Sequence, residues 1–177
     1  MLTISNWTIY KDYKIYSKKS NIPLKTFFNL NFYVNIIYRL SHLFFEIRLF
    51  PLAKILWLIN RIIFSIDIDP GARLAGGLEI IHGIGIVIGR YVESKGPIKI
   101  YQGATIGGNS NKTKYLNGKF LKQPLLNSEI TIGINAVVVG PIIIDDNVII
   151  GSNAVVTKDV GKNIIIVGNN KVLRKQY

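Results

Sequence analysis

The sequence contains no cysteine and only two histidines among its 177 residues. The absence of cysteine excludes disulfides and thiolate metal sites, and two histidines are too few for a histidine-rich metal centre. The amino-terminal residues lack the apolar core and cleavage site of a secretory signal, and no later apolar run is long enough to span a bilayer. We therefore expect one main domain, in the cytoplasm and without a bound metal.

Acidic residues are also scarce: 10 Asp and Glu face 22 Lys and Arg, which gives a net charge of +12. An excess of this size suits an anionic partner such as nucleic acid, anionic lipid or a phosphorylated small molecule. Much of the basic excess precedes residue 62. No interleaved aromatic platform or known motif accompanies it, so we expect no nucleic-acid partner.

Apolar residues in this basic region recur at mixed spacings of three and four, which predicts helices over roughly 26–49 and 52–64. The second helix carries Lys54 and Arg61 on one face. Two interpretations stay open. The helices pack on the main domain or on a partner subunit, or residues 1–64 contact the inner surface of a cell membrane.

Beyond this region, small or aliphatic residues recur at every sixth position. The first ladder consists of Leu74, Ile80, Ile86, Val92, Ile98 and Ala104, then pauses, and resumes with Ile130, Ala136, Ile142, Val148, Ala154, Val160, Ile166 and Val172. A second ladder runs two residues later, from His82 to Val156. Period six indicates stacked short parallel strands, and neither an α-helix nor a hairpin sheet produces it. The pattern predicts a mainly β fold, a parallel β-helix over 66–177 after a helical region over 1–65, with an excursion loop over 107–129.

The stretches "IDIDPGARLAGGLEIIHG", "GIVIG", "IYQGATIGG" and "IIGSNAVVTKDV" resemble the serine acetyltransferase branch of the hexapeptide-repeat acyltransferases. The resemblance covers about residues 65–172. Within the branch it is most similar to shorter members found in capsule, exopolysaccharide and O-antigen biosynthesis. It implies a left-handed β-helix, a homotrimer, acetyl-coenzyme A as donor, and active sites in clefts between neighbouring subunits.

The resemblance also implies that His82 is the general base and that Asp67, fifteen residues earlier, orients it. The chemistry agrees, since a hydroxyl needs a base to attack a thioester at neutral pH and a carboxylate fixes the tautomer of an imidazole. Gly107 and Gly108 match glycines beside the thioester. Further candidates for binding the coenzyme are Ile134, Ser152, Lys158, Lys171 and Arg174.

Departures from the family pattern concern the acceptor. In serine acetyltransferases an aspartate at the position of Ile81 holds the ammonium group of serine. An arginine and a histidine at the positions of Lys122 and Gln123 receive the carboxylate of serine. Burying an ammonium without its counter-charge costs on the order of several kcal/mol. We therefore expect an O-acetyltransferase acting on a sugar hydroxyl of a surface polysaccharide or its precursor. The acceptor-binding candidates are Asp69, Gln102, Lys122 and Gln123. The alternatives are a serine O-acetyltransferase of cysteine biosynthesis and a non-catalytic trimeric scaffold.

Overall fold

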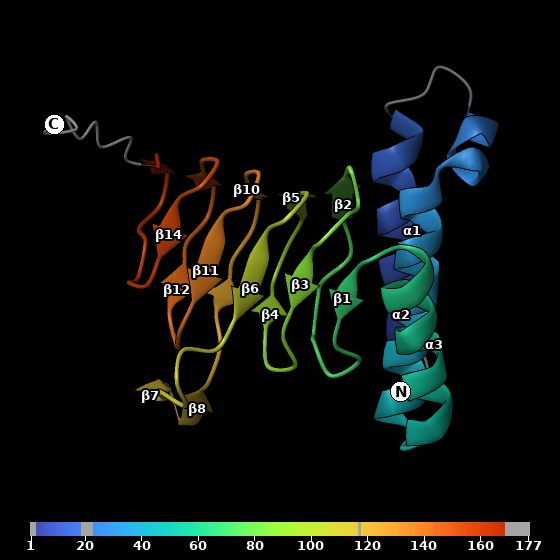
Figure 1. Ribbon diagram of the computed structural model, residues 1–177, viewed down its shortest axis with the longest axis horizontal. Coiled ribbons are helices and arrows are strands. Elements are labelled where there is room, and N and C mark those ends of the chain that lie inside the picture. Colours follow the sequence, from blue (N-terminus) through green and yellow to red (C-terminus); the bar gives the residue numbers. More distant parts are fainter. Residues whose placement is uncertain (1–2, 19–22, 117, 169–177) are drawn as a thin grey trace, which may run out of the picture.

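The computed structural model describes residues 3–18, 23–116 and 118–168, with helices stacked against one end of a coil of short strands (Figure 1). The helical elements are α1 (Thr3–Lys18), the 3₁₀ helix η1 (Pro23–Phe28), α2 (Leu30–Glu46) and α3 (Phe50–Ile63). The sequence analysis did not predict α1, and it merged η1 with α2. The two separate at Asn29, whose side chain accepts a hydrogen bond from the backbone N–H of Asn31 and caps α2.

The strands of the coil form three parallel sheets. They are β1 (Asp67–Ile68), β2 (Leu78–Ile81), β3 (Val87–Ile88), β4 (Glu93–Ser94), β5 (Ile98–Tyr101), β6 (Thr105–Gly107), β9 (Leu125–Leu126), β10 (Ile130–Ile132), β11 (Val137–Val139), β12 (Ile143–Ile144), β13 (Ile149–Ile150), β14 (Val155–Val156) and β15 (Ile165–Ile166). The β1 sheet has the order β1-β3-β6-β11-β14, the β2 sheet β15-β13-β10-β5-β2, and the β4 sheet β12-β9-β4. Each strand pairs with the equivalent strand of the next coil, as Val87 does with Thr105, eighteen residues later.

The interior of the coil consists of the ladder residues, as the sequence predicts. The first ladder is buried from Leu74 to Val160, and Ile166 is partly buried. Val172 lies outside the described residues. The second ladder is buried from Ile88 to Val156 but not at His82. Because neighbouring strands lie about 4.8 Å apart, equivalent aliphatic side chains stack into one continuous core.

The excursion from the coil is shorter than the predicted 107–129. It carries an antiparallel hairpin of β7 (Lys114–Leu116) and β8 (Lys119–Leu121). The chain has returned by β9, where the fully buried Leu126 pairs with strands of the coils on either side. Lys114 forms an ion pair with Asp159 of a later coil. Burial raises the pKa of Asp159, but hydrogen bonds from Lys114 and the Ile143 N–H outweigh it and lower the pKa.

The inner faces of the helices close the first end of the core, which supports the interpretation that they pack on the main domain. Val34 and Tyr38 of α2 belong to the same hydrophobic cluster as the coil. Tyr38 is fully buried and donates a hydrogen bond to the Ala72 carbonyl at 2.7 Å, and burial raises its pKa to about 12. Among the described residues, no helix is long and apolar enough to cross a membrane.

A buried carboxylate joins α1 to both α2 and the coil. Asp12 is completely buried and accepts hydrogen bonds from Arg39 Nε at 2.9 Å and Nη2 at 3.2 Å. It also accepts the backbone N–H groups of Gly77 at 2.7 Å and Leu78 at 2.9 Å. Arg39 donates in turn to the carbonyls of Leu74 and Ala75. This cluster satisfies backbone groups at the start of β2 that no earlier coil covers.

Candidate active site

Several predicted site residues lie along one edge of the coil, where the chain passes from the β2 sheet to the β1 sheet. Backbone hydrogen bonds stack the successive corners: Gly103 donates to Ile84, Asn135 to Gln102, and Asn153 to Ile134, at 2.8–3.0 Å. We call this edge the first ridge. The predicted site residues on or beside it are Asp67, His82, Gln102, Ile134 and Ser152.

The corner that carries His82 is longer than the other corners of this ridge. Asp67 pairs with Val87 and Leu78 with Ile98, in both cases across twenty residues, whereas Val87 pairs with Thr105 across eighteen. The two extra residues therefore lie between β2 and β3. They carry His82 out of the inward ladder, so the sequence-based placement of His82 in that ladder is wrong.

His82 is exposed and has a φ of 52°, in the left-handed region that non-glycine residues rarely adopt. The following Gly83 lets the widened corner pack against α2, since a Cβ there would lie 2.6 Å from Asn31 Oδ1 and 2.7 Å from Ile66 Cδ1. Asn31 also donates to the Ile80 carbonyl at 3.1 Å. The fold thus supports this corner from beneath and presents the imidazole to solvent.

Asp67 lies at the same ridge, one coil earlier, because its N–H donates to the Ile86 carbonyl at 2.8 Å. Its Oδ1 accepts a hydrogen bond from Trp57 Nε1 at 2.7 Å, and its Oδ2 lies 3.5 Å from Arg61 Nη1. No hydrogen bond joins Asp67 to His82 in the part of the chain that is described. The predicted pair therefore shares a ridge without a direct hydrogen bond.

Sequence reasoning missed Trp57 and Arg61 as partners of Asp67. The signal is their spacing of four, which puts both on one face of the helix immediately before β1. The Arg61 guanidinium lies 5.2 Å from the centroid of the Trp57 ring, so the two side chains stack and approach the carboxylate together. A carboxylate has about four acceptor sites, so Asp67 retains the capacity to accept another donor.

A second ridge follows the next edge, between the β1 and β4 sheets, where the excursion leaves the coil. Gln123 Oε1 accepts the Tyr91 N–H at 3.0 Å, and Lys122 Nζ lies 4.7 Å from the centroid of the Tyr91 ring. Both side chains line a cavity of about 500 Å³ together with Gly108 and residues 109–113. The structure therefore brings together the predicted residues Lys122, Gln123 and Gly108.

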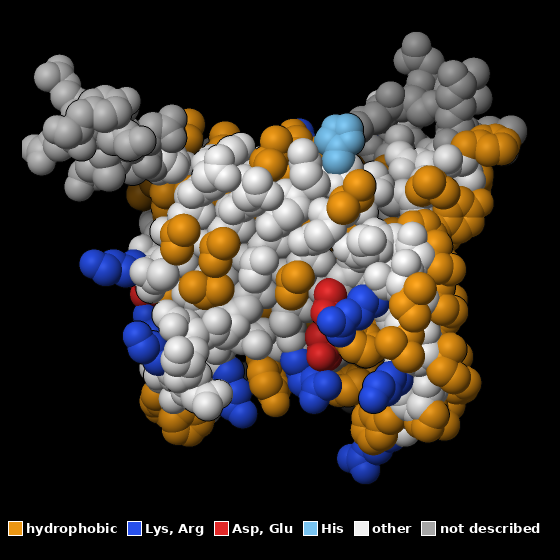
Figure 2. All heavy atoms as spheres, in the orientation of Figure 1, with side chains coloured by type: hydrophobic (Ala, Val, Ile, Leu, Met, Phe, Trp, Pro, Cys, Tyr) orange, Lys and Arg blue, Asp and Glu red, His pale blue; other side chains and the backbone are white. Residues whose placement is uncertain are grey.

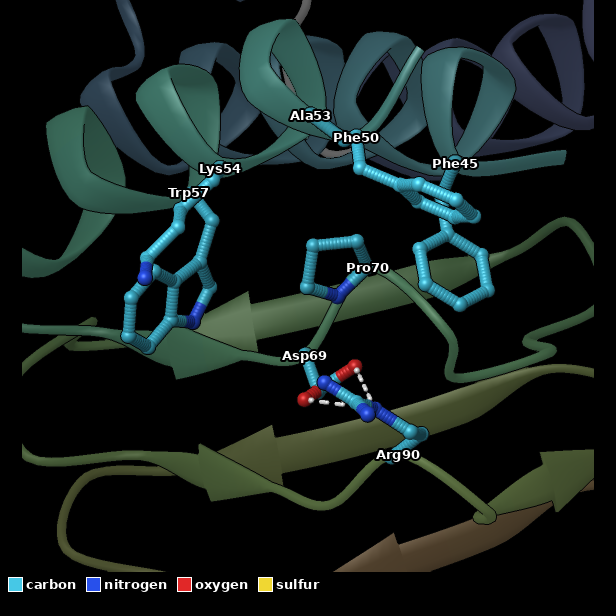
Figure 3. A pocket seen from close by; sticks show the side chains of 8 residues that line it. All are labelled: Phe45, Phe50, Ala53, Lys54, Trp57, Asp69, Pro70 and Arg90. Atoms are coloured by element: carbon cyan, nitrogen blue, oxygen red, sulfur yellow. Dashed lines mark hydrogen bonds and ion pairs between the residues drawn. The ribbon is translucent and has the colours of Figure 1, made fainter. Parts of the chain in front are cut away.

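Asp69 lies on the second ridge but faces a different cavity. Its carboxylate is bound by Arg90 Nε at 3.1 and 3.3 Å and by the Gly71 N–H at 2.8 Å. The hydrogen bond with Asp69 raises the pKa of Arg90. Figure 3 shows this pair beneath Pro70, with aromatic side chains of α2 and α3 around a cavity of about 530 Å³. Asp69 is therefore separated from the cavity that Lys122 and Gln123 line.

The coenzyme candidates divide between the two ridges. Ile134 and Ser152 are exposed on the first ridge, and Lys158 is exposed on the second. Gly107 ends β6, and a Cβ there would meet nothing within 4 Å, so packing within the chain does not require this glycine and space remains for a ligand. Lys171 and Arg174 lie outside the described residues.

Two further observations bear on the chemistry of the site. Gln102 Oε1 is buried without a hydrogen-bond partner in the described part of the chain, which marks it as an acceptor in need of a donor. Among the described residues, no group of three or more His, Cys, Asp or Glu side chains is placed to hold a metal ion.

The two ridges do not meet within one chain. They are separated by the β1 sheet, whose strands are two or three residues long, so the separation is about 10 Å. His82 therefore lies across this sheet from Gly108, Lys122 and Gln123.

Comparisons with known proteins give consistent results, although no protein-family model matches the chain. It is 39% identical over 132 residues to a serine acetyltransferase of Helicobacter pylori, covering 75% of this chain and 74% of the relative. It is 35% identical over 133 residues to the Synechococcus elongatus serine acetyltransferase, covering 75% and 52%. A solved structure of Neisseria gonorrhoeae serine acetyltransferase in complex with serine superposes with a TM-score of 0.80 at 28% identity, covering 93% and 67%.

These similarities first define a class: the fold is the left-handed parallel β-helix of hexapeptide-repeat transferases, as predicted. The match to the H. pylori relative then establishes the family. The chain belongs to the serine acetyltransferase family. The predicted enzyme class and co-substrate, O-acetyl transfer from acetyl-coenzyme A, are confirmed with it. The finer resemblance to capsule and exopolysaccharide enzymes is not supported, because the relatives compared are serine acetyltransferases.

Proposed function

We propose that the protein transfers the acetyl group of acetyl-coenzyme A to the hydroxyl of L-serine. The observation that carries the proposal is the similarity to serine acetyltransferases over three quarters of the chain. The prediction of a sugar acceptor is wrong. It gave the replacement at Ile81 more weight than the similarity to serine acetyltransferases over the rest of the chain. Other groups can supply the charges that serine needs: Lys122 is a cation for the carboxylate, and Asp67 is a carboxylate on the same ridge as His82.

In the proposed reaction His82 takes the proton of the serine hydroxyl as the oxygen attacks the thioester carbonyl. The new ester C–O bond forms, the C–S bond breaks, and the coenzyme leaves as a thiolate that receives the proton. In this reaction the Asp67 carboxylate uses its remaining acceptor capacity to take a hydrogen bond from the imidazole of His82, which orients the ring and stabilises its charged form, while Trp57 and Arg61 hold that carboxylate in place. The backbone at Gly107 and Gly108 faces the negative charge that develops on the carbonyl oxygen.

The proposed active form is a homotrimer with its coils side by side and parallel to the three-fold axis. The support is the separation of the two ridges, since a cyclic assembly places the first ridge of one chain beside the second ridge of the next. Each of the three sites then takes His82 from one subunit and Lys122 and Gln123 from its neighbour. A cytoplasmic location, and a contact of residues 1–64 with the inner face of the membrane, also stay proposals.

The acceptor is tested by following the release of coenzyme A thiol from acetyl-coenzyme A. L-Serine is expected to stimulate release, and L-alanine, which has the same charges but no hydroxyl, is the matched control. D-Serine tests whether the hydroxyl must be presented from one stereochemistry. Equal rates with L-serine and L-alanine would show that serine is not the acceptor.

The shared site makes a second prediction. A His82→Ala chain and a Gly108→Trp chain, whose indole would fill the cavity beside Gln123, are each expected to be inactive as homotrimers. When they are unfolded together and reassembled at equal amounts, about a quarter of the sites receive an intact His82 and an intact Gly108, so about a quarter of the wild-type rate is expected to return. If the mixture stays as inactive as its components, the site does not combine residues of two chains.

A further inference from the structure

The outward sides of α2 and α3 carry rows of exposed apolar side chains. The rows repeat at helical spacing and consist of Leu30, Tyr33 and Leu40 on α2 with Ile47 at its C-cap, and Leu52, Ile55, Ile62 and Ile63 on α3. We call these residues the outer face. Figure 2 shows hydrophobic side chains gathered along the edge of the molecule that the helices form. Ile55 and Ile62 are 53% and 76% exposed, far from the burial that such side chains favour.

A helix that folds on a domain usually points its apolar stripe inward and its polar side outward. The helix α3 departs from this pattern on both of its sides. Its inward side is held partly by polar contacts, as Asn60 donates to the Val34 carbonyl and Ser41 of α2 donates to the Ala53 carbonyl. Its outward side is apolar. A contiguous apolar surface of this kind indicates an interaction site.

The charges around the outer face are almost all of one sign. In the described part of α1 to α3 and their connections, the exposed cations are Lys11, Lys14, Lys18, Arg48, Lys54 and Arg61. Glu46 is the one exposed acid there, and it lies 3.8 Å from Arg73. Asp12 is buried and bound to Arg39. The surroundings of the outer face therefore favour an anionic partner.

We propose that the outer face docks on the surface of a membrane rich in anionic phospholipid. The apolar rows enter the boundary between headgroups and acyl chains, and Arg48, Lys54 and the lysines of α1 meet lipid phosphates. A second copy of the chain fits less well, because it would bring the same excess of cations to the contact. Nothing in this mode needs a helix that crosses the bilayer.

The position of the outer face in the fold suits a flat surface. The helices cover one end of the coil (Figure 1), and hydrophobic side chains line the far edge of that end (Figure 2), so the outer face points along the coil axis. In the proposed trimer, on which this step rests, three parallel coils present three outer faces in one plane and in one direction. Three weak contacts then act together, which raises the overall affinity well above that of a single face.

Vesicle flotation tests the proposal without any substrate, so its outcome is independent of the acceptor. The full chain is expected to float with vesicles that contain phosphatidylglycerol, and to float less with pure phosphatidylcholine or at high salt. Ile55→Gln/Ile62→Gln is expected to lower the partition coefficient by about tenfold or more, since two large apolar side chains are lost from the contact. Arg48→Gln/Lys54→Gln is expected to weaken binding to the anionic vesicles alone.

The matched control is Val155→Gln/Ile165→Gln, which replaces side chains that are 66% and 65% exposed at the other end of the coil. This variant is expected to float like the wild type, and circular dichroism checks that all variants are folded. Absence of flotation with anionic vesicles at low salt would overturn the proposal. An equal loss of flotation in Ile55→Gln/Ile62→Gln and in the control Val155→Gln/Ile165→Gln would overturn it as well. So would an assembly larger than a trimer that dissociates only in Ile55→Gln/Ile62→Gln, because the outer face would then join copies of the chain.

Discussion

Replacing His82 with alanine is expected to lower kcat by a factor of about 10²–10⁴, the usual contribution of a general base. The KM for acetyl-coenzyme A is expected to change little, because His82 is assigned to the acceptor hydroxyl. Only a modest loss of stability is expected, since His82 is exposed and the cost is limited to the strain of alanine in the left-handed region, about 1–2 kcal/mol at most. Steady-state kinetics and a thermal melt measure both effects.

The backbone at His82 calls for a second variant. Its φ of 52° is strained for alanine, whereas asparagine adopts this region more readily. His82→Asn therefore keeps the corner without supplying a base, and it is expected to be as inactive as His82→Ala. If His82→Asn kept wild-type kcat, the corner's shape and not the imidazole would be what the reaction requires.

Asp12→Ala is expected to destabilise the protein by about 3–5 kcal/mol, because it leaves the buried Arg39 without its counter-charge. It also removes the acceptor of the Gly77 and Leu78 N–H groups. For a chain of this size, each kcal/mol lowers the Tm by about 2–4 °C, so the loss is large in a thermal melt. Chemical denaturation provides an independent measure.

The matched control is Asp159→Ala, which breaks the exposed ion pair with Lys114 and the hydrogen bond from the Ile143 N–H, and which is expected to cost about 1–2 kcal/mol. The double variant Asp12→Ala/Arg39→Met removes both buried charges and is expected to regain part of the loss. Similar melts for Asp12→Ala and Asp159→Ala would mean that the buried cluster does not hold the helices on the coil.

The coil could be predicted because its chemistry repeats. A buried position every six residues requires an aliphatic residue on every side of every coil. The strand pairing between coils follows from this local pattern, so it can be predicted without knowledge of long-range contacts. The pattern did not reveal the widened corner. Ile80 and Ile86 both point inward and are six residues apart, although the coil that contains them is two residues longer than the regular eighteen. Leu126 was missed too, although it lies six residues before Ile132 and so marks the end of the excursion.

The edge of the coil on which the site residues lie was easier to predict than the hydrogen bonds and ion pairs that these residues form. His82 and Asp67 do occupy one ridge, but the partners of Asp67 come from α3, and periodicity does not report the contact between a helix and a coil. Likewise α1 has no clear apolar stripe, and its burial depends on Asp12 finding Arg39 far along the chain. The acceptor was misjudged for a related reason: a missing counter-charge at Ile81 says nothing about charges that reach the cleft from elsewhere.

The ladder of eighteen-residue coils also limits how the length of the gene can change. An insertion of one residue within a strand exchanges the inward and outward side chains in the rest of that strand, whereas an insertion at a corner leaves the register intact. Both irregularities of this chain obey that rule: the corner of His82 adds two residues, and the excursion adds fourteen between Thr105 and its partner Val137. Corners are thus where this fold can gain or lose residues without disturbing its core, and in this chain they also carry the residues of the proposed reaction.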